Sequence, residues 1–319
     1  MAASTPTPHR RMFTSSLFTG GWNPADHDRR AVSQRSVADP ADAQSCPKSR
    51  GHAADLSAGL DDAISLVHFG SGGYGDRVAD PIFAERRLAE VYDPLDPDRS
   101  DLDVYAAMAR EFGAHSVLDI GCGTGAFACL LAHQGLDVTA VDPAAASLEV
   151  ARTKPGADRV RWLHGCAVDL PPLQVDLATM TANVAQVFLT DEDWASTLLA
   201  AHAALRPGGR LVFETRDPTA KAWLEWNHER SHKHTMIPGV GEVETWVDLI
   251  DVSGDLVSFR WTFVFTSDGT RLTSDSTLRF RRRDEVAASL AGAGYLVSEV
   301  RQAPDRPGRE MVFIAQRPE

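Results

Sequence analysis

The sequence is poor in cysteine, in basic charge and in long apolar runs, and each shortage argues against a class of protein. Only 4 of the 319 residues are Cys, and their spacing fits neither a zinc site nor a disulfide framework, so we expect reduced thiols. Acidic residues outnumber basic ones by 44 to 32, for a formal net charge of −12. This balance disfavours nucleic acid as the main partner, because phosphate binding requires a basic face.

Long hydrophobic runs are also missing. No stretch has the length and hydrophobicity of a membrane span, and the first residues do not have the pattern of a signal peptide. Hydrophobic residues make up 43% of the chain and charged residues 24%, which is typical of globular proteins. We therefore expect a soluble, cytoplasmic protein with no membrane partner.

The first 77 residues differ in composition from the remainder. Residues 1–60 are rich in Ser, Pro, Ala, Asp and Arg without sustained apolar periodicity, so they cannot bury enough surface to offset their chain entropy. Residues 70–76 add a glycine-rich stretch. We interpret residues 1–77 as a disordered or mis-annotated N-terminal extension, with translation starting at Val78, and expect one folded domain over residues 78–319.

Strand and helix patterns alternate through the first part of that domain. Short apolar runs predict strands at 117–120, 136–141, 159–164, 174–181 and 211–214. Helical patterns lie between them at 125–134, 145–153 and 191–205. Such alternation predicts a parallel sheet with right-handed crossovers.

Residues 217–275 break this alternation. A Trp-rich helix is expected first, followed by period-2 runs at 242–250, 256–265 and 271–280 that predict an antiparallel meander. We place this inserted segment over the carboxyl ends of the sheet, where it would cover a substrate. A helix at 285–291 and strands at 295–301 and 310–316 are expected to close the domain.

The most informative stretch is 117–125, Val-Leu-Asp-Ile-Gly-Cys-Gly-Thr-Gly. A buried strand ends there in glycines, which let the backbone turn sharply and let a ligand approach closely. A second strand ends at Asp142, 17 residues after Gly125, where a carboxylate accepts hydrogen bonds from a ribose. These features predict a βαβ nucleotide-binding unit.

The glycine spacing distinguishes two kinds of nucleotide site. Dinucleotide-binding proteins carry Gly-x-Gly-x-x-Gly, which cradles a pyrophosphate, whereas this loop is Gly-x-Gly-x-Gly with Asp119 two residues before it. A carboxylate at that position repels phosphate and attracts a cationic ligand. The pattern resembles the class I S-adenosylmethionine-dependent methyltransferases of the small-molecule type.

This resemblance covers about residues 82–319. It implies an α/β fold with a Rossmann-like, doubly wound, seven-stranded sheet whose last strand is antiparallel, and the β-meander is then an insertion. It also implies the cofactor S-adenosyl-L-methionine, with Asp119 orienting its ammonium and Asp142 holding both ribose hydroxyls. The expected cofactor-binding residues are Tyr92, Asp119, Gly121, Cys122, Gly123, Gly125, Asp142, Pro143, Cys166, Ala167 and Asn183.

One position departs from the family pattern. Cys166 stands where relatives carry an Asp that accepts from the adenine amino group, and a thiol is a weak acceptor. The Ala167 backbone N–H is expected to bond the adenine in its place. Two other members of the set have competing interpretations: Tyr92 as a core aromatic, and Asn183 as a satisfied buried amide.

Methyl transfer from a sulfonium is an in-line displacement, which needs positioning and exclusion of water rather than a covalent nucleophile. A base is needed only for an alcohol or a protonated amine, and the candidates are His232 and His234, with His228 nearby. We interpret that histidine segment as a flexible polar loop and expect no metal. The expected substrate-binding residues are Gln186, Arg216, Trp223 and Trp246.

These substrate assignments have structural alternatives: a buried amide for Gln186, pairing with Asp217 for Arg216, and meander core for some of the tryptophans. We expect an enzyme that methylates N, O or C of a small-molecule acceptor. A tRNA or protein methyltransferase and a non-catalytic cofactor-binding protein are the alternatives. The sequence identifies neither the acceptor nor the oligomeric state.

Overall fold

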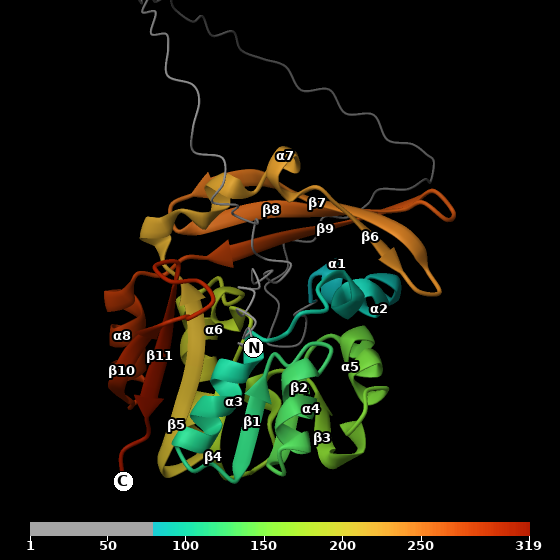
Figure 1. Cartoon of the computed structure of the whole chain (residues 1–319). Helices are drawn as coiled ribbons and strands as arrows, with labels where there is room; N and C mark the ends of the chain where they lie inside the picture. Colours follow the sequence, from blue (N-terminus) through green and yellow to red (C-terminus); the bar gives the residue numbers. More distant parts are fainter. Residues whose placement is uncertain (1–78) are drawn as a thin grey trace, which may run out of the picture. The chain divides into compact units, whose positions relative to one another are not determined.

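The computed structural model describes residues 79–319, so the predictions made for residues 1–77 and for Val78 lie outside the described residues. Within 79–319 the strands form two sheets (Figure 1). The larger sheet has seven strands in the order β10-β11-β5-β4-β1-β2-β3, and the smaller has four in the order β6-β7-β8-β9. The strands of the larger sheet are β1 (Ser116–Ile120), β2 (Asp137–Asp142), β3 (Val160–His164), β4 (Val175–Met180), β5 (Leu205–Arg216), β10 (Leu296–Gln302) and β11 (Glu310–Gln316).

The larger sheet has the predicted topology. Strands β1 to β5 pair in parallel, whereas β11 is antiparallel to both of its neighbours, β5 and β10. Parallel pairing brings the carboxyl ends of β1, β2 and β4 to one edge of the sheet. The predicted Rossmann-like sheet with an antiparallel last strand is therefore confirmed.

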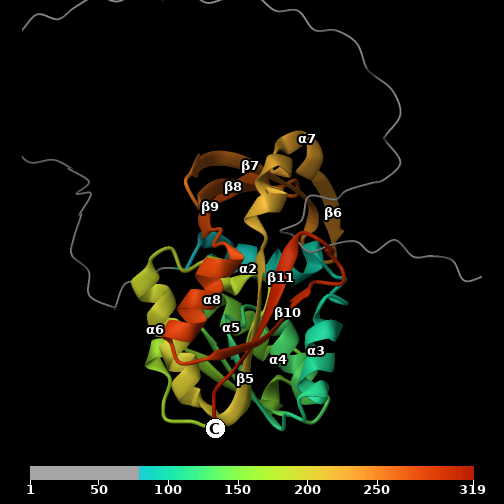
Figure 2. The same cartoon turned by 90° about the vertical axis from the view of Figure 1, so that its left-hand side faces the viewer.

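Helices cover both faces of this sheet because its strands are apolar on both sides. Helices α3 (Leu102–Glu111) and α4 (Ala126–His133) pack on one face, and α6 (Asp191–Ala204) and α8 (Arg283–Gly292) pack on the other (Figure 2). Helix α5 (Ala145–Arg152) follows β2. Among residues 79–319, no helix is long and hydrophobic enough to cross a bilayer.

The smaller sheet consists of β6 (Lys233–Ile237), β7 (Gly241–Ser253), β8 (Leu256–Phe265) and β9 (Thr270–Arg279). Two short helices, α1 (Pro81–Ala84) and α2 (Arg86–Leu95), lie between it and the carboxyl edge of the larger sheet (Figure 1). Their apolar side chains, including Leu88 and Val91, share a core with Val243 and Phe263 of the smaller sheet. Helices α1 and α2 therefore connect the smaller sheet to the carboxyl edge of the larger sheet.

Three local predictions are wrong. Strand β6 was not expected, because Lys-His-Thr-Met-Ile lacks a clear apolar alternation and the strand is stabilised by pairing with β7. The Trp-rich helix is a 3₁₀ turn, η6 (Ala222–Glu225), followed by the short helix α7 (His228–Ser231). Helix α6 ends at Ala204 without a glycine stop, because the next residues already belong to β5.

Candidate cofactor and acceptor site

The glycine loop joins β1 to α4, and all three of its glycines have positive φ. A Cβ at Gly121 would lie 2.7 Å from Val184, and one at Gly125 would lie 2.5 Å from Trp162. At Gly123 a Cβ would meet no described atom within 4 Å. Gly121 and Gly125 are therefore needed for close packing, whereas the position of Gly123 leaves open space beside the backbone for a ligand.

Asp142 ends β2 directly beside this loop. Its Oδ2 accepts the backbone N–H of Gly123 and its Oδ1 accepts that of Ala144, both at 2.8 Å. Burial raises the pKa of Asp142 above its ordinary value, and the two N–H donors oppose that rise. A carboxylate has about four acceptor positions, so both oxygens keep capacity for two ribose hydroxyls.

Asp119 is on β1, and its side chain is almost fully buried. Its Oδ1 accepts the Thr179 hydroxyl at 3.1 Å, whereas its Oδ2 has no hydrogen-bond partner within residues 79–319. Burial raises the pKa of Asp119 to about 7, with a further contribution from the charge of Asp142. Leaving a buried acceptor unpaired is costly, and an ammonium group is a fitting partner for it.

A further set of contacts, which the sequence did not reveal, binds α2 to the glycine loop. Asp93 accepts the Thr124 hydroxyl at 2.7 Å and also pairs with the ammonium of Lys154. Lys154 donates in addition to the Thr124 carbonyl at 2.6 Å. The only sequence signal is the position of Asp93 next to Tyr92, whose ring is what makes Tyr92 a predicted cofactor contact.

Tyr92 lies on α2 at the point where these contacts are made. Its ring packs at 5.7 Å from that of Phe83, and burial raises its pKa to about 12. The phenol is therefore neutral at ordinary pH. Tyr92 has core contacts and also neighbours the loop, so its predicted role beside the cofactor stays a prediction.

Cys166 starts the turn after β3. Its backbone N–H donates to Asp169 Oδ2 at 2.9 Å, and its thiol caps the same 3₁₀ turn, η3 (Ala167–Asp169). Asp169 is thereby committed to the turn, which disfavours it as a replacement for the missing adenine acceptor. The carbonyl of Pro143, which directly follows β2, accepts a hydrogen bond from His164 Nε2 at 3.0 Å.

On the other side of the loop, Asn183 follows β4 in a left-handed conformation with φ of 62°. Its backbone N–H donates to Glu214 Oε1 at 2.9 Å, and its Nδ2 donates to Glu310 Oε1 at 3.0 Å. Within residues 79–319, Asn183 Oδ1 and Glu214 Oε2 have no hydrogen-bond partner. Burial, with the nearby charge of Glu310, raises the pKa of Glu214 to about 7.

Gln186 and Arg216 meet in the interior. Arg216 Nη1 donates to Gln186 Oε1 at 2.8 Å, and Gln186 Nε2 donates to the Arg279 carbonyl at 3.3 Å. Burial lowers the pKa of Arg216 to about 10. Arg216 Nε also lies 3.9 Å from Glu310 Oε1, whereas Asp217, the alternative partner suggested by the sequence, accepts from Thr219.

The remaining predicted residues lie on both faces of the smaller sheet. Trp223 is half-buried against Phe280, with ring centroids 4.7 Å apart. Trp246, His232 and His234 lie on the opposite face from Val243 and Val247, whose side chains join the core with α2. They are not brought to the glycine loop. The flexible-loop interpretation is wrong, because His234 belongs to β6 and His232 directly precedes it.

A seven-stranded sheet with this order, a Gly-x-Gly-x-Gly turn after β1 and an acid at the end of β2 define the class I methyltransferase fold. Residues 117–209 match the family model of the methyltransferase domain. The expected resemblance to class I S-adenosylmethionine-dependent methyltransferases is thus confirmed, and residues 117–209 are the part of the chain that matches the methyltransferase domain.

Individual relatives agree with this assignment. The chain is 33% identical over 113 residues to ubiquinone biosynthesis O-methyltransferase of Idiomarina loihiensis, covering 34% of this chain and 45% of that protein. It is 29% identical over 145 residues to the cypemycin N-terminal methyltransferase of a Streptomyces species, covering 44% and 59%. The chain therefore spans about half the length of these relatives.

A solved structure extends the match in fold. The sugar N-methyltransferase KedS8 from a Streptoalloteichus species superimposes with a TM-score of 0.61 at 21% identity. The match covers 80% of this chain and 99% of that chain. It therefore includes more of the fold than the 117–209 segment alone.

Proposed function

We propose that this protein is an S-adenosylmethionine-dependent methyltransferase that acts on a small-molecule acceptor. One observation carries the proposal: Asp119 and Asp142 flank the open position at Gly123, and each has acceptor capacity left for a ligand. An unpaired buried carboxylate fits an ammonium, and a carboxylate fixed by backbone N–H groups fits a diol. The names of the relatives and of the similar solved structure, which include O- and N-methyltransferases, support the same reaction.

When bound, S-adenosylmethionine supplies a methyl group on a positively charged sulfur. Asp119 would hold its ammonium, Asp142 its ribose hydroxyls, and Gly123 would leave room for it. The Asp93–Thr124 contact holds α2 over the loop, which helps to exclude water from the displacement. Cys166 and Ala167 are proposed contacts of the adenine. The other residues of the predicted cofactor set, Tyr92, Gly121, Cys122, Gly125 and Pro143, stay proposed contacts of the cofactor.

On the acceptor side, we now favour Asn183 and Glu214 over the predicted histidines. Within residues 79–319, each has one buried oxygen without a hydrogen-bond partner, although the Tyr105 hydroxyl lies close to the Glu214 carboxylate. Asn183 directly precedes Val184, whose side chain occupies the space beside Gly121. A carboxyl group with a pKa of about 7 is suited to receive a proton from an alcohol or an ammonium near neutral pH. Trp223 is still proposed to line the acceptor site. Gln186 and Arg216 are proposed to hold the acceptor site in position from the protein interior. Cytoplasmic location also stays a prediction.

Calorimetric titration with S-adenosylmethionine and S-adenosylhomocysteine tests the cofactor site. The unmodified chain should bind both, and Asp142→Ala should bind them at least about tenfold more weakly, because two charge-assisted hydrogen bonds are lost. Asp137→Asn, at the exposed start of the same strand, is the matched control and should bind normally. A folded Asp142→Ala variant with unchanged affinity would contradict the proposal.

The acceptor is then sought by measuring S-adenosylhomocysteine release with panels of amines, alcohols and carboxylic acids. Turnover with a small molecule supports the proposed substrate class. Turnover only with tRNA or a protein would favour that alternative. Cofactor binding without turnover on any panel would favour a non-catalytic cofactor-binding protein.

A further inference from the structure

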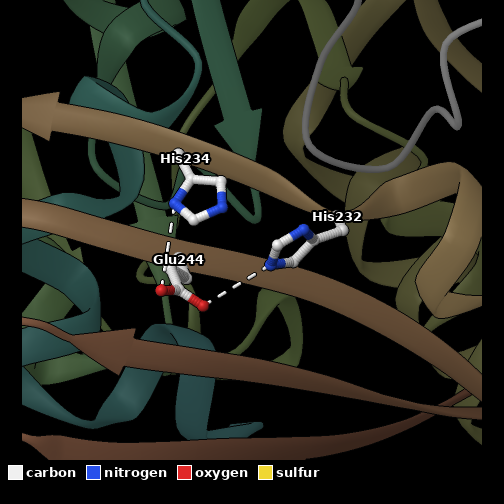
Figure 3. Close-up of side chains that lie close together, drawn as sticks. All are labelled: His232, His234 and Glu244. Carbon is white, nitrogen blue, oxygen red and sulfur yellow. Dashed lines mark ion pairs between the residues drawn. The ribbon is translucent and has the colours of Figure 1, made fainter.

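Three metal-ligating side chains converge on the outer face of the smaller sheet, away from the glycine loop (Figure 3). They are His232, His234 and Glu244, and their candidate ligand atoms all lie within 4.8 Å of one another. His232 Nε2 is 3.5 Å from Glu244 Oε2, and His234 Nδ1 is 3.9 Å from Glu244 Oε1. The carboxylate thus faces both imidazoles, one with each oxygen.

The backbone fixes this arrangement. The β6–β7 register pairs His234 directly with Glu244, and His232, two residues before His234, falls on the same face because side chains alternate along an extended chain. His232 is held in turn by its neighbour Ser231, whose hydroxyl accepts the Val247 N–H at 2.9 Å. The three ligands are therefore presented by paired strands and an anchored turn.

Two more residues surround the group. Glu242 Oε1 lies 3.3 Å from His234 Nδ1, and the His228 ring stacks on the His232 ring with centroids 4.6 Å apart. Side chains of His232 and Glu244 are about a third exposed, so the group is open to solvent ions. Because the group is open to solvent, water is available as a fourth ligand.

We propose that His232, His234 and Glu244 bind a divalent transition-metal ion, with Zn²⁺ as the best match, in place of the metal-free surface that the sequence suggested. Two imidazoles and one carboxylate are an established Zn²⁺ ligand set that leaves a fourth position for water. Bonds of about 2.0–2.2 Å in a tetrahedron place ligand atoms about 3.4 Å apart, so small side-chain rotations close the set. Mg²⁺ and Ca²⁺ are disfavoured because they prefer all-oxygen ligands.

Such an ion would join the edge strand β6 to β7. Because His232 directly follows α7, the ion would also fasten the end of that helix to the sheet. Binding to the folded state alone stabilises it by mass action. The proposal is independent of methyl transfer, since the site lies on the face opposite the core shared with α2.

The test uses the full chain without an affinity tag, stripped of metal, in calorimetric titrations with ZnCl₂ and, separately, MgCl₂. We expect saturable Zn²⁺ binding that is at least about a hundredfold weaker in His234→Gln and in Glu244→Gln, since even outer-shell changes cost about 10–100-fold. His115→Gln, an exposed histidine outside the cluster, should bind Zn²⁺ normally. Zn²⁺, and not Mg²⁺, should raise the thermal midpoint of the unmodified chain.

Absence of Zn²⁺ binding in the unmodified chain would overturn the proposal. So would equal Zn²⁺ binding by the unmodified chain and the His234→Gln/Glu244→Gln double variant, because the ion would then be held elsewhere. Thermal midpoints measured without metal verify that each variant is folded. If His234→Gln does not fold, Glu244→Gln decides the matter, since it keeps the side-chain volume and removes only the charged ligand.

Discussion

At the scale of single residues, the two carboxylates beside the glycine loop have different roles in binding. Asp142 is fixed by two backbone N–H groups and so is ready to accept a diol. Asp119 is buried, one of its oxygens has no hydrogen-bond partner among residues 79–319, and its pKa is about 7. Its charge, and hence its attraction for an ammonium, should therefore depend on pH near neutrality.

We predict that the affinity for S-adenosylmethionine increases as the pH rises through about 7, the pKa of Asp119 in the ligand-free protein. The measurement is calorimetry from about pH 5.5 to 7.5, with each affinity corrected for the fraction of the ligand whose α-amino group, of pKa about 7.7–8.0, has lost its proton. Asp119→Asn should bind weakly and with a flatter pH profile. Glu214 also has a pKa of about 7 and is unchanged in Asp119→Asn, so some pH dependence of the affinity can remain in that variant. A pH dependence as steep as that of the unmodified chain would contradict the assignment to Asp119.

The same pKa has a consequence for folding. A folded-state pKa raised from 3.8 to about 7 means that the folded chain binds this proton more tightly than the unfolded chain does. The contribution of Asp119 to stability is thus complete below about pH 4 and is lost as the pH rises through about 7. The free energy of unfolding of Asp119→Asn should fall less steeply over that interval, as urea titrations at several pH values would measure.

Residues of the candidate site differed in how far the sequence could predict them. Asp119 and Asp142 were found because their positions relative to the glycines are local features of the chain. Glu214 was missed as a partner of Asn183, since the two are 31 residues apart and no local pattern marks a buried contact between strands. Gln186 and Arg216 stood out in the sequence as polar residues near the ends of predicted strands. Their hydrogen bond to each other could not be predicted, because it joins residues 30 positions apart.

At the scale of elements, short apolar runs predicted every strand of the larger sheet. The signal is strongest in β1 and β4, because strands buried on both faces are nearly continuous in apolar residues. The same reasoning missed β6, whose His234 faces solvent and whose pairing with β7 supplies its stability. It also left open what holds α2 in place. The structure answers this with the Asp93–Thr124–Lys154 contacts.

We predict that Thr124→Val loosens α2. The variant removes a hydroxyl that donates to a carboxylate, an interaction of about 1.5–3 kcal/mol, while nearly preserving the side-chain volume. Hydrogen exchange of the amides in 86–95 should become faster, and S-adenosylmethionine should bind more weakly. Glu90→Gln, which breaks an exposed pair on the same helix, is the control and should alter neither. Unchanged exchange in Thr124→Val would show that α2 is held by its apolar core alone.

At the scale of the whole described chain, a buried polar network links the two sheets. Arg216, at the end of β5, donates to Gln186, which donates in turn to the Arg279 carbonyl at the end of β9. The Arg216 guanidinium also lies 5.8 Å over the Trp226 ring, in the core of the smaller sheet. We therefore expect this network to stabilise the attachment of the smaller sheet to the larger.

A double-mutant cycle in the full chain tests this coupling. Arg216→Met alone leaves the buried Gln186 oxygen without its donor and should lower the free energy of unfolding by about 1–3 kcal/mol. Gln186→Leu alone leaves Arg216 without that acceptor and should cost at least as much, because a charged group then loses a partner. The double variant replaces both with apolar side chains, so it should be less destabilised than the sum of the single variants.

The exposed pair Arg260–Asp275 provides the comparison, since its side chains are 48% and 55% exposed and such pairs contribute little. Arg260→Met should hardly change the urea midpoint. Strictly additive effects at Arg216 and Gln186 would contradict the coupling. If Arg216 instead clamps a substrate carboxylate, as the sequence first suggested, Arg216→Met should raise the KM for the acceptor while leaving the midpoint unchanged. A change in the urea midpoint of Arg216→Met therefore indicates a structural role for Arg216, whereas a change in the KM for the acceptor indicates a role in substrate binding.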